Sequence, residues 1–424
     1  MSKSRSILEL SSIIQQKVSI VDQTLKDNQL PPLSFDTGAP LSSQIPVSIE
    51  DTKYDLLEAL GELQALLHGP LYHVMHMSSI VPNNAAVFGV LSKFDIPQNL
   101  GADECVSYAE LGKRCGLLES DTRRLVRGAV ALRFFDEPET DKVRHNAASL
   151  ALATPGAAAW VKSTLRNSTP SALKLADALA QYPGSEDPRE TGFALANGGR
   201  DFFTVLQEEP ERAADFAQAM SMQSLGPERN VSYCVEALAA WDRVAECPRV
   251  IVDVGGSHGT LAEALVRRYP RVEHAIVQDL PKTVKDAKVP EDLLKGNRFR
   301  FMAHDFFTEQ PAKDADVYLF RQVLHDWSDS KCVEILKSQI PALKPGARII
   351  LIETCAPPPG AHTHSRDIDH RIMDIAMKHH ANGKERTSDD FRALFAAVDE
   401  KFEMVSIRRP PGSAMSVIEF TWRG

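Results

Sequence analysis

The sequence predicts an α/β protein whose second half forms a mostly parallel sheet and whose first half is mainly helical. Three observations support this fold class. Five consecutive residues of strand character, Val250–Val254, run directly into the glycine turn Gly255–Gly259 and an amphipathic helix. From Arg249 onward, strand-like and helix-like segments alternate regularly, as in a doubly wound parallel sheet. The chain ends in two alternating segments, 402–408 and 414–422, which predict an antiparallel edge hairpin.

A chain of 424 residues is longer than one with a single compact core usually is, so its length predicts several domains. We expect an N-terminal helix with a Pro- and Ser-rich crossing (1–48), a second domain (49–160), and an α/β domain (161–424) whose helical subregion (161–245) binds substrate. A net charge of −9 argues against a general surface for nucleic acid or anionic membrane. Six cysteines without a C-x-x-C pair, and no run of 18 apolar residues, predict a soluble cytoplasmic protein.

The first two helices are predicted from apolar spacing and from their ends. Apolar residues recur at steps of three and four over 6–27, which predicts a helix that covers a core or a partner subunit. A second helix, Tyr54–Leu67, is expected to stop at Gly69–Pro70, because this pair is a common signal for a helix end.

Residues 85–150 have the pattern of a winged helix-turn-helix. A Ser-x-x-Glu capping box at Ser107 opens one helix, and a helix over 120–132 carries three arginines. Two short segments, 134–136 and 142–144, would form the wing. A DNA-binding regulator is therefore one alternative, although an arginine-rich helix face is more often simply solvated and the chain is acidic.

Residues 155–245 are almost wholly helical and contain large, adaptable apolar side chains. Such side chains usually form a core, but beside an α/β domain they could also roof an apolar substrate pocket. The residues expected to line that pocket, here and later in the chain, are Phe203, Met220, Trp327, Met373, Met377 and His380.

The α/β region is predicted to be Rossmann-like, with a regular order of elements. Strands are expected at 249–254, 274–278, 299–303, 315–320 and 347–353. Helices are expected at about 259–269, 281–287, 329–340 and 366–380.

The glycine turn after the first strand departs from the dinucleotide fingerprint G-x-G-x-x-G. The fingerprint would require glycine at position 254, where this chain has Val254, and an acid, Asp253, stands at the strand end. A cofactor with cationic groups and without phosphates suits this turn better. S-adenosylmethionine (SAM) is such a cofactor, and we expect Asp253, Gly255 and Gly256 to contact it.

Ligands of parallel α/β sheets bind at the carboxyl ends of the strands. Asp279 follows the second strand at the spacing where an acid accepts ribose hydroxyls; a helix cap is the alternative. Asp305 and Phe306 follow the third strand and suit an adenine amine and ring. His325 follows the fourth strand, where an imidazole of near-neutral pKa beside an apolar pocket could accept a proton from a phenolic hydroxyl.

Two glutamates could support His325. Glu353 ends the fifth strand and could reach an imidazole or a substrate hydroxyl. Glu385 lies in the turn 382–387, and a carboxylate on the far ring nitrogen would fix the tautomer and stabilise the imidazolium. Alone, His325 would be interpreted as a structural histidine and Glu385 as an exposed loop charge.

A cluster of histidines near three aspartates invites a metal site, but its spacing matches no recognised ligand set. We therefore expect no metal. The histidines are His362, His364, His370, His379 and His380.

Five motifs, in this order and spacing, resemble the plant caffeate-type O-methyltransferase family, and its fungal secondary-metabolism branch is the closer match. The resemblance covers about residues 50–424. The motifs are Val-Asp-Val-Gly-Gly-Ser-His-Gly at 252–259, Gln-Asp-Leu-Pro at 278–281, His-Asp-Phe-Phe at 304–307, Leu-His-Asp-Trp-Ser-Asp at 324–329 and Gly-Lys-Glu-Arg-Thr at 383–387.

The resemblance implies a homodimer whose N-terminal winged-helix-like domain serves dimerisation, acting on a small molecule without a metal. His325 would be the proton acceptor, flanked by Glu353 and Glu385, and S-adenosylhomocysteine would be a product. The residues that would hold SAM by position are Gly255, Asp279, Asp305, Phe306 and Arg321.

The sequence departs from the family at three places. Ser257–His258 stands in the glycine turn where small residues are common, and Phe306 stands where methionine is common. Arg321 stands where lysine is common, which keeps the charge and changes its geometry.

The activity predicted by these observations is SAM-dependent methylation of a hydroxyl, expected to be phenolic, on a small aromatic or polyketide-type secondary metabolite. A second alternative is a methyltransferase-like pericyclase that retains SAM without consuming it. His325 with both glutamates favours methyl transfer, because a pericyclic step has less need of a general base.

Overall fold

The structure, a computed structural model, describes residues 5–243, 245–285, 287–294, 298–358 and 360–424. The chain divides into two compact units. Unit 1 comprises Met1–Pro170, Leu206–Met222 and His362–Asp369. Unit 2 comprises Ser171–Val205, Gln223–Ala361 and His370–Gly424. The sequence predicts three consecutive segments of the chain as domains, whereas these two units each combine separate segments, so the predicted division stays a prediction.

Unit 1 begins with two helices that pack against each other, α1 (Ile7–Asp27) and α2 (Glu50–Lys93). Within α2, Gly69 has φ 67° and ψ 160°, a conformation that glycine adopts readily and other residues rarely do. The helix resumes at Pro70, where a first-turn proline costs no hydrogen bond. The predicted helix end at Gly69–Pro70 is therefore confirmed, and the structure adds a second helical segment that begins at Pro70 and that the sequence did not predict over this whole length.

The helices and the hairpin predicted for residues 85–150 are present in unit 1, but the first strand of the hairpin lies at Asp136–Glu139 and not at the predicted 134–136. α3 (Tyr108–Cys115) is capped by the Ser107 hydroxyl, and α4 (Glu119–Ala131) follows. β2 (Asp136–Glu139) and β3 (Lys142–Arg144) pair antiparallel, and β1 (Cys105–Ser107) joins the other edge of β3.

Further helices lie between these elements or lead to the α/β region, and those from α6 onward confirm the helical character predicted for residues 155–245. They are η1 (Val47–Ile49), η2 (Pro97–Asn99), α5 (Ala147–Ala153), α6 (Pro155–Ser163), η3 (Thr164–Ser168, a π-helical turn), α7 (Thr169–Leu173), α8 (Leu175–Gln181), α9 (Gly192–Ala196), α10 (Phe202–Glu208), α11 (Pro210–Leu225), η4 (Pro227–Arg229), α12 (Val231–Ala237) and η5 (Ala239–Asp242).

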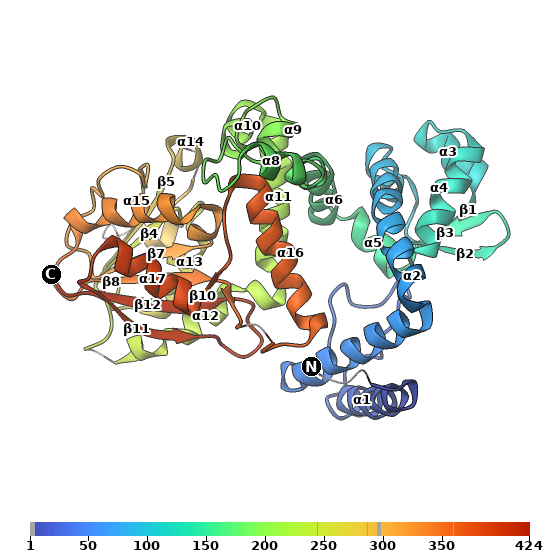
Figure 1. The fold of residues 1–424 in the computed structure, drawn as a ribbon, viewed down its shortest axis with the longest axis horizontal. Helices are drawn as coiled ribbons and strands as arrows, with labels where there is room; N and C mark the ends of the chain where they lie inside the picture. The colour runs from blue at the N-terminus through green and yellow to red at the C-terminus, as the bar shows by residue number, and fades with distance from the viewer. Residues whose placement is uncertain (1–4, 244, 286, 295–297, 359) are drawn as a thin grey trace. The chain divides into compact units, whose positions relative to one another are not determined.

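Unit 2 is built on a seven-stranded sheet with the order β11-β12-β8-β7-β4-β5-β6 (Figure 1). Five strands run parallel, and β12 and β11 form the predicted antiparallel hairpin at one edge. Every predicted strand is found, with its ends within about two residues of the expected ones. The strands are β4 (Val250–Val254), β5 (His274–Asp279), β6 (Phe299–Ala303), β7 (Val317–Arg321), β8 (Arg348–Glu353), β11 (Phe402–Arg408) and β12 (Ser416–Trp422).

Helices cover both faces of this sheet. α15 (Asp329–Gln339) and α17 (Ser388–Val398) share one buried cluster with the strands, and α12 and α13 (Thr260–Arg268) share the other. The other elements are α14 (Pro281–Val284), η6 (Glu291–Leu293), η8 (Leu324–Asp326), η9 (Ile340–Ala342) and α16 (His364–Ala381). The predicted helix 281–287 is shorter than expected, and its residue Asp286 lies outside the described residues.

The parallel strands place their carboxyl ends at one edge, where β4, β5, β7 and β8 end in Val254, Asp279, Arg321 and Glu353. A two-residue parallel pair extends this edge, because Arg386 of β10 (Arg386–Thr387) pairs with Cys355 of β9 (Cys355–Ala356). Since β9 follows β8 and β10 follows Glu385, the pair brings Glu385 to the strand ends. Among the described helices, none combines the length and apolar character that crossing a bilayer requires.

Candidate active site

The glycine turn after β4 is packed too closely for side chains. Gly255 has φ 71°, and a Cβ on it would lie 3.0 Å from Val323 Cγ2 and 3.8 Å from a ring carbon of Phe306. A Cβ on Gly256 would lie 2.6 Å from Asp253 Cγ. The turn therefore passes directly over the Asp253 carboxyl group and beside the Phe306 ring, which brings four predicted cofactor residues together.

Asp253 is buried at the end of β4. Neither of its carboxyl oxygens accepts a hydrogen bond of ordinary geometry among the described residues. Burial raises the pKa of Asp253 to about 7, while the Arg321 charge and the amide of Ala262 act in the opposite direction. Buried polar atoms normally find partners, so these oxygens fit a ligand that is cationic or donates hydrogen bonds.

Asp279 ties the glycine turn to β5. Its two carboxylate oxygens accept hydrogen bonds from the amides of Ser257 (2.9 Å) and Leu280 (2.8 Å). Ser257 has φ 51°, and this amide contact helps to hold it in that left-handed conformation. Each carboxylate oxygen keeps a second lone pair, so ribose hydroxyls could still be accepted there. Leu280, not Asp279, is the N-cap residue of α14, and this helix has no side-chain capping hydrogen bond, so the alternative role of Asp279 as a helix cap is not found.

Phe306 begins a chain of aromatic rings that leads away from the glycine turn. Its ring lies 6.1 Å from that of Trp327, and Trp327 stacks on Phe203 at 5.1 Å with an angle of 13° between the planes. Asp305, beside Phe306, accepts a hydrogen bond from the Phe307 amide at 3.0 Å, which fixes the turn after β6. The predicted cofactor residue Phe306 and two predicted substrate residues thus form one aromatic wall.

Arg321, at the end of β7, lies on the Asp253 side of the site, where its charge favours the ionised form of that carboxyl group. Its Nη2 donates to the carbonyl of Arg229 at 3.1 Å. Its buried Nε has no hydrogen-bond partner among the described residues.

His325 lies on η8, the single helical turn after β7. Its Nδ1 is 2.9 Å from Glu385 Oε1, and its Nε2 is 3.6 Å from Asp326 Oδ1. The side chains of His325 and Glu385 are only 12% and 2% exposed. Burial, the largest single influence, lowers the pKa of His325, but the charges of Asp326, Glu353 and Glu385 together outweigh it and raise that pKa to about 10. The expected near-neutral pKa was therefore wrong, because the sequence places two glutamates beside the imidazole but does not show that their charges, with that of Asp326, outweigh the effect of burial.

Glu353 supports the turn rather than the ring. Its Oε1 accepts hydrogen bonds from the amides of Val323 (3.0 Å) and Leu324 (2.9 Å), whereas its buried Oε2 has no partner among the described residues. Burial raises the pKa of Glu353 to about 7, against the opposing effect of the His325 charge.

The segment before β10 lies backbone against backbone on the His325 turn. A Cβ on Gly383 would lie 2.3 Å from the His325 carbonyl oxygen. The amide of Lys384 donates to that oxygen at 3.0 Å, and the amide of Glu385 donates to Asp374 Oδ1 at 3.0 Å. Position 383 therefore has no room for a side chain. Because glycine lets the backbone lie this close to the His325 turn, Glu385 can reach the imidazole.

Arg386 is a residue that the sequence analysis missed. It is 1% exposed and donates to the carbonyls of Leu324 (2.8 Å) and Trp327 (2.9 Å) and to Asp329 Oδ1 (2.8 Å). The signal that could have drawn attention to it is its place in the motif at 383–387, directly after Glu385. Nothing in the spacing alone indicates that this arginine is buried.

The predicted substrate residues are divided between the two units. Met220 lies on α11 in unit 1, whereas Phe203, Trp327 and the three residues of α16 lie in unit 2. Those three are Met373, Met377 and His380. Within unit 2, the His380 ring stacks on Phe202 at 5.2 Å, and Phe203 stacks on Trp327, so α10 contacts both α16 and the His325 turn.

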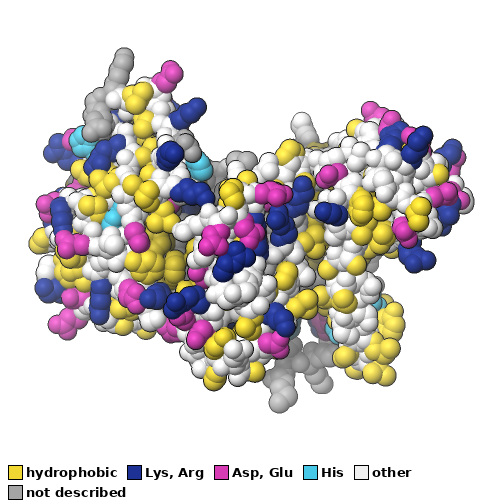
Figure 2. Space-filling view, turned by 90° about the horizontal axis from the view of Figure 1, so that it is seen from above, with side chains coloured by type: hydrophobic (Ala, Val, Ile, Leu, Met, Phe, Trp, Pro, Cys, Tyr) yellow, Lys and Arg dark blue, Asp and Glu magenta, His cyan; other side chains and the backbone are white. Residues whose placement is uncertain are grey.

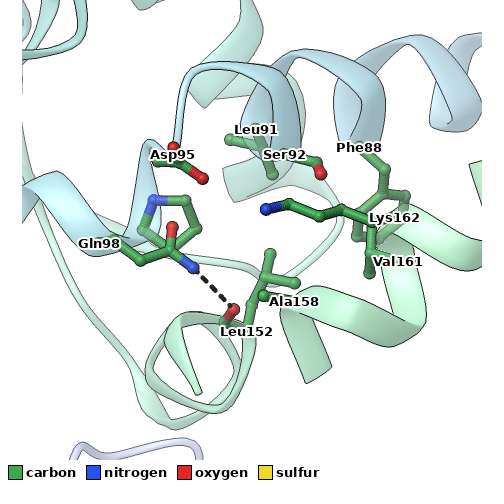
Figure 3. Close-up of a pocket in the computed structure, with 10 residues that line it drawn as sticks. Phe88, Leu91, Ser92, Asp95, Gln98, Leu152, Ala158, Val161 and Lys162 are labelled. Carbon is green, nitrogen blue, oxygen red and sulfur yellow. Dashed lines mark hydrogen bonds between the residues drawn. The ribbon is translucent and has the colours of Figure 1, made fainter. Parts of the chain in front are cut away.

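A pocket in unit 1 contains none of the predicted site residues (Figure 3). It lies between the end of α2 and α6, with the Lys162 side chain directed into it and the Gln98 amide bonded to the Leu152 carbonyl at 3.5 Å. Among the described residues, no group of three or more His, Cys, Asp or Glu side chains is arranged to hold a metal ion.

Two of the three arginines of α4 that suggested DNA binding, Arg123 and Arg127, are paired with carboxylates. Arg123 contacts Glu119 (2.5 Å) and Asp141 (2.8 Å), and Arg127 contacts Glu137 (2.6 Å). On the face seen in Figure 2, basic and acidic side chains are intermixed. Little positive charge on α4 is therefore left for a phosphate backbone.

Comparison with known proteins agrees with this geometry. A family model described as an O-methyltransferase domain matches residues 174–399. The O-methyltransferase kk1A of Curvularia clavata is 35% identical over 418 residues, which cover 98% of this chain and 97% of that protein. A crystal structure of OxaC in complex with SAH and oxaline has a TM-score of 0.75 at 22% identity, covering 97% of this chain and 100% of that one. A structure described as a pericyclic reaction enzyme has a TM-score of 0.75 at 24% identity, with the same coverage.

Proposed function

This chain belongs to the family of SAM-dependent O-methyltransferases, and we propose that it methylates a phenolic hydroxyl of a small aromatic or polyketide-type metabolite, with His325 as the proton acceptor. The observation that carries the proposal is the buried contact between His325 Nδ1 and Glu385 Oε1, at the same sheet edge as the glycine turn. Glu385 holds the proton on Nδ1, which leaves Nε2 as the nitrogen that can accept one.

The residues at the glycine turn fit SAM. Gly255 and Gly256 have no side chains, so a ligand could approach their backbone. The carboxyl oxygens of buried Asp253 have no hydrogen-bond partner among the described residues, and a cationic group of the ligand could be that partner. Asp279 would hold the ribose, and Asp305 and Phe306 the adenine, with Arg321 beside Asp253. When bound, SAM supplies a methyl group activated by its attachment to a positively charged sulfur.

The ionisation of His325 supports a phenolic substrate. A phenol has a pKa near 10, and the carboxylates around His325 raise the pKa of its imidazole to about 10. Proton transfer between groups of matched pKa is close to balanced, whereas an aliphatic hydroxyl is far too weak an acid for this imidazole. The aromatic wall of Phe306, Trp327 and Phe203 also suits an aromatic ring.

The subunit arrangement that we propose is a homodimer formed through unit 1. Large apolar side chains are exposed on α2 around and after its kink, including Leu67 (71%), Leu71 (76%) and Val74 (65%). Faces of this kind on single chains usually mark protein contacts.

The dimer is tested by light scattering after size exclusion. Leu71→Glu should give monomers, whereas Leu173→Glu, at an exposed apolar residue of α7, should not. Equal masses for both variants and the wild type would contradict this interface.

The substrate class is tested with matched acceptors. Incubation with SAM and a set of phenols, paired with aliphatic alcohols of similar size, should release S-adenosylhomocysteine with phenols only. Turnover of the aliphatic alcohols at comparable rates would refute the phenolic assignment without affecting the family.

A further inference from the structure

We propose that Glu353 and Arg386 are a pair of positioning residues that cap the two ends of the helical turn carrying His325 and so fix the direction of its imidazole. The inference rests on the proposed function, because it takes His325 as the proton acceptor. It assigns Glu353 to the backbone of the turn and gives a role to Arg386.

The turn Leu324–Asp326 cannot hold its shape by itself. A single 3₁₀ turn leaves most of its amides and carbonyls without partners inside the helix, and in this turn Leu324 is fully buried while His325 and Asp326 are partly buried. It is also entered through Gln322 at φ 53°, a left-handed conformation that non-glycine residues adopt only when their surroundings enforce it. Its position must therefore be set by contacts from elsewhere in the chain.

Glu353 provides those contacts at the start of the turn. One oxygen, Oε1, accepts from two successive amides, Val323 at 3.0 Å and Leu324 at 2.9 Å. Glu353 ends a central strand and is 1% exposed, so its carboxylate has little freedom to move. A negative charge at the amino end of a helical turn also complements the dipole of the turn.

Arg386 provides the matching contacts at the end of the turn. Nη1 donates to the Leu324 carbonyl at 2.8 Å and Nη2 donates to the Trp327 carbonyl at 2.9 Å. Nε donates to Asp329 Oδ1 at 2.8 Å, which orients the guanidinium plane. A buried arginine with its donors directed at carbonyls is the counterpart of the carboxylate at the other end.

The two caps are joined to each other. Arg386 pairs with Cys355 in the β9–β10 ladder, and Cys355 follows Glu353 by two residues in the chain. Glu385, the partner of the imidazole, directly precedes Arg386. One short parallel pair therefore fixes both ends of the turn and the carboxylate on His325 Nδ1 as one assembly.

The sharpest test of this assignment is Arg386→Lys, which keeps the positive charge and loses the fork of donors. We expect kcat to fall about 10- to 100-fold, as for a displaced catalytic group, while the SAM dissociation constant changes less than about twofold. The acid limb of the pH–kcat/KM profile should move to lower pH, because a displaced ring loses its close contact with Glu385. A purely structural role would lower the melting temperature and leave that limb in place.

Four further variants complete the test. Glu353→Gln keeps an oxygen that can accept both amides and should lower kcat much less than Glu353→Leu. Arg392→Lys alters an exposed arginine paired with Asp389 on α17 and should change nothing. If Arg386→Lys does not fold, Asp329→Asn is the deciding variant, because Asp329 is half exposed and its substitution should not prevent folding. This substitution should lower kcat about 3- to 10-fold, because it changes only the orientation of the Arg386 guanidinium.

The assignment is overturned if folded Arg386→Lys, or failing that Asp329→Asn, keeps the wild-type kcat and pH limb. It is also overturned if Glu353→Gln is as damaging as Glu353→Leu. Failure of the proposed function would appear differently, as wild-type protein that transfers no methyl group or as His325→Ala that retains full activity.

Discussion

Glu385→Gln removes one negative charge from the imidazole and keeps an oxygen that can accept the Nδ1 hydrogen. The wild-type contact is 2.9 Å and both side chains are nearly buried. The carboxylates raise the pKa of His325 to about 10. Because a raised histidine pKa favours the imidazolium, the proton-accepting form of wild-type His325 should increase with pH up to that value.

The size of the effect follows from the distance. Opposite charges about 4 Å apart at an effective dielectric constant of about 20 attract by about 4 kcal/mol. At 1.36 kcal/mol for each pKa unit, this corresponds to at most about 3 units, and opposite charges at such distances commonly shift a pKa by about 1–3 units. The pKa of His325 in Glu385→Gln should therefore fall by about 1–3 units.

The assay is the pH dependence of kcat/KM for a phenolic acceptor, which reports the ionisations of the free enzyme. We expect the acid limb of Glu385→Gln to lie about 1–3 pH units below that of the wild type. Its plateau should be about 100-fold lower, because an amide stabilises the imidazolium less well. Asp389→Asn, at a 93% exposed residue, is the matched control. An unmoved limb with a reduced plateau would refute the charge argument.

Three other predictions follow from the same geometry. Burial raises the pKa of Asp253 to about 7, so this group should make the cofactor-free protein less stable as pH rises from about 4 to 7. Asp253→Asn should therefore raise the melting temperature at pH 8 but not at pH 4. The same substitution should weaken SAM binding, measured by calorimetry. Gly383→Ala should reduce turnover at least about 100-fold, because its Cβ would lie 2.3 Å from the His325 carbonyl, whereas Gly89→Ala, where no atom lies within 4 Å, should be silent in the same assay. Asp279→Ala should weaken SAM by about 2–3 kcal/mol in equilibrium binding and leave the Glu385-dependent pH limb unchanged; a binding loss below tenfold would count against the ribose role.

The sheet could be predicted from sequence because its signals are local. Each parallel strand is a short apolar run followed by a turn, and the final hairpin has alternating residues on both sides of a Pro-Pro-Gly turn. The helix end at Gly69 was also predicted from a local signal, whereas the helical segment that begins directly after it was missed. Gly-Pro is a signal for a helix end, and the φ of 67° at Gly69 redirects the chain; the pair does not show that a new helix begins at once at Pro70.

The sequence predicts which candidate residues lie at the carboxyl ends of the strands, but not the contacts that they make there. The rule that ligands meet strand ends placed Asp253, Asp279 and His325 at one edge, and the structure has them there. The role of Glu353 on two backbone amides and the burial of Arg386 depend on a two-residue β pair between segments far apart in sequence. A pair of two residues is too short to show a periodic pattern in the sequence. The raised pKa of His325 depends on the same long-range contacts, because they bring several carboxylates close to its ring.

The most direct measurement compares wild type and His325→Ala for SAM binding and for release of S-adenosylhomocysteine with a phenolic acceptor. The account predicts that both proteins bind SAM with similar affinity, that the wild type methylates the acceptor, and that the variant does not. Product formed by the wild type while SAM remains unconsumed would contradict methyl transfer. Full turnover by the variant would contradict the role of the imidazole.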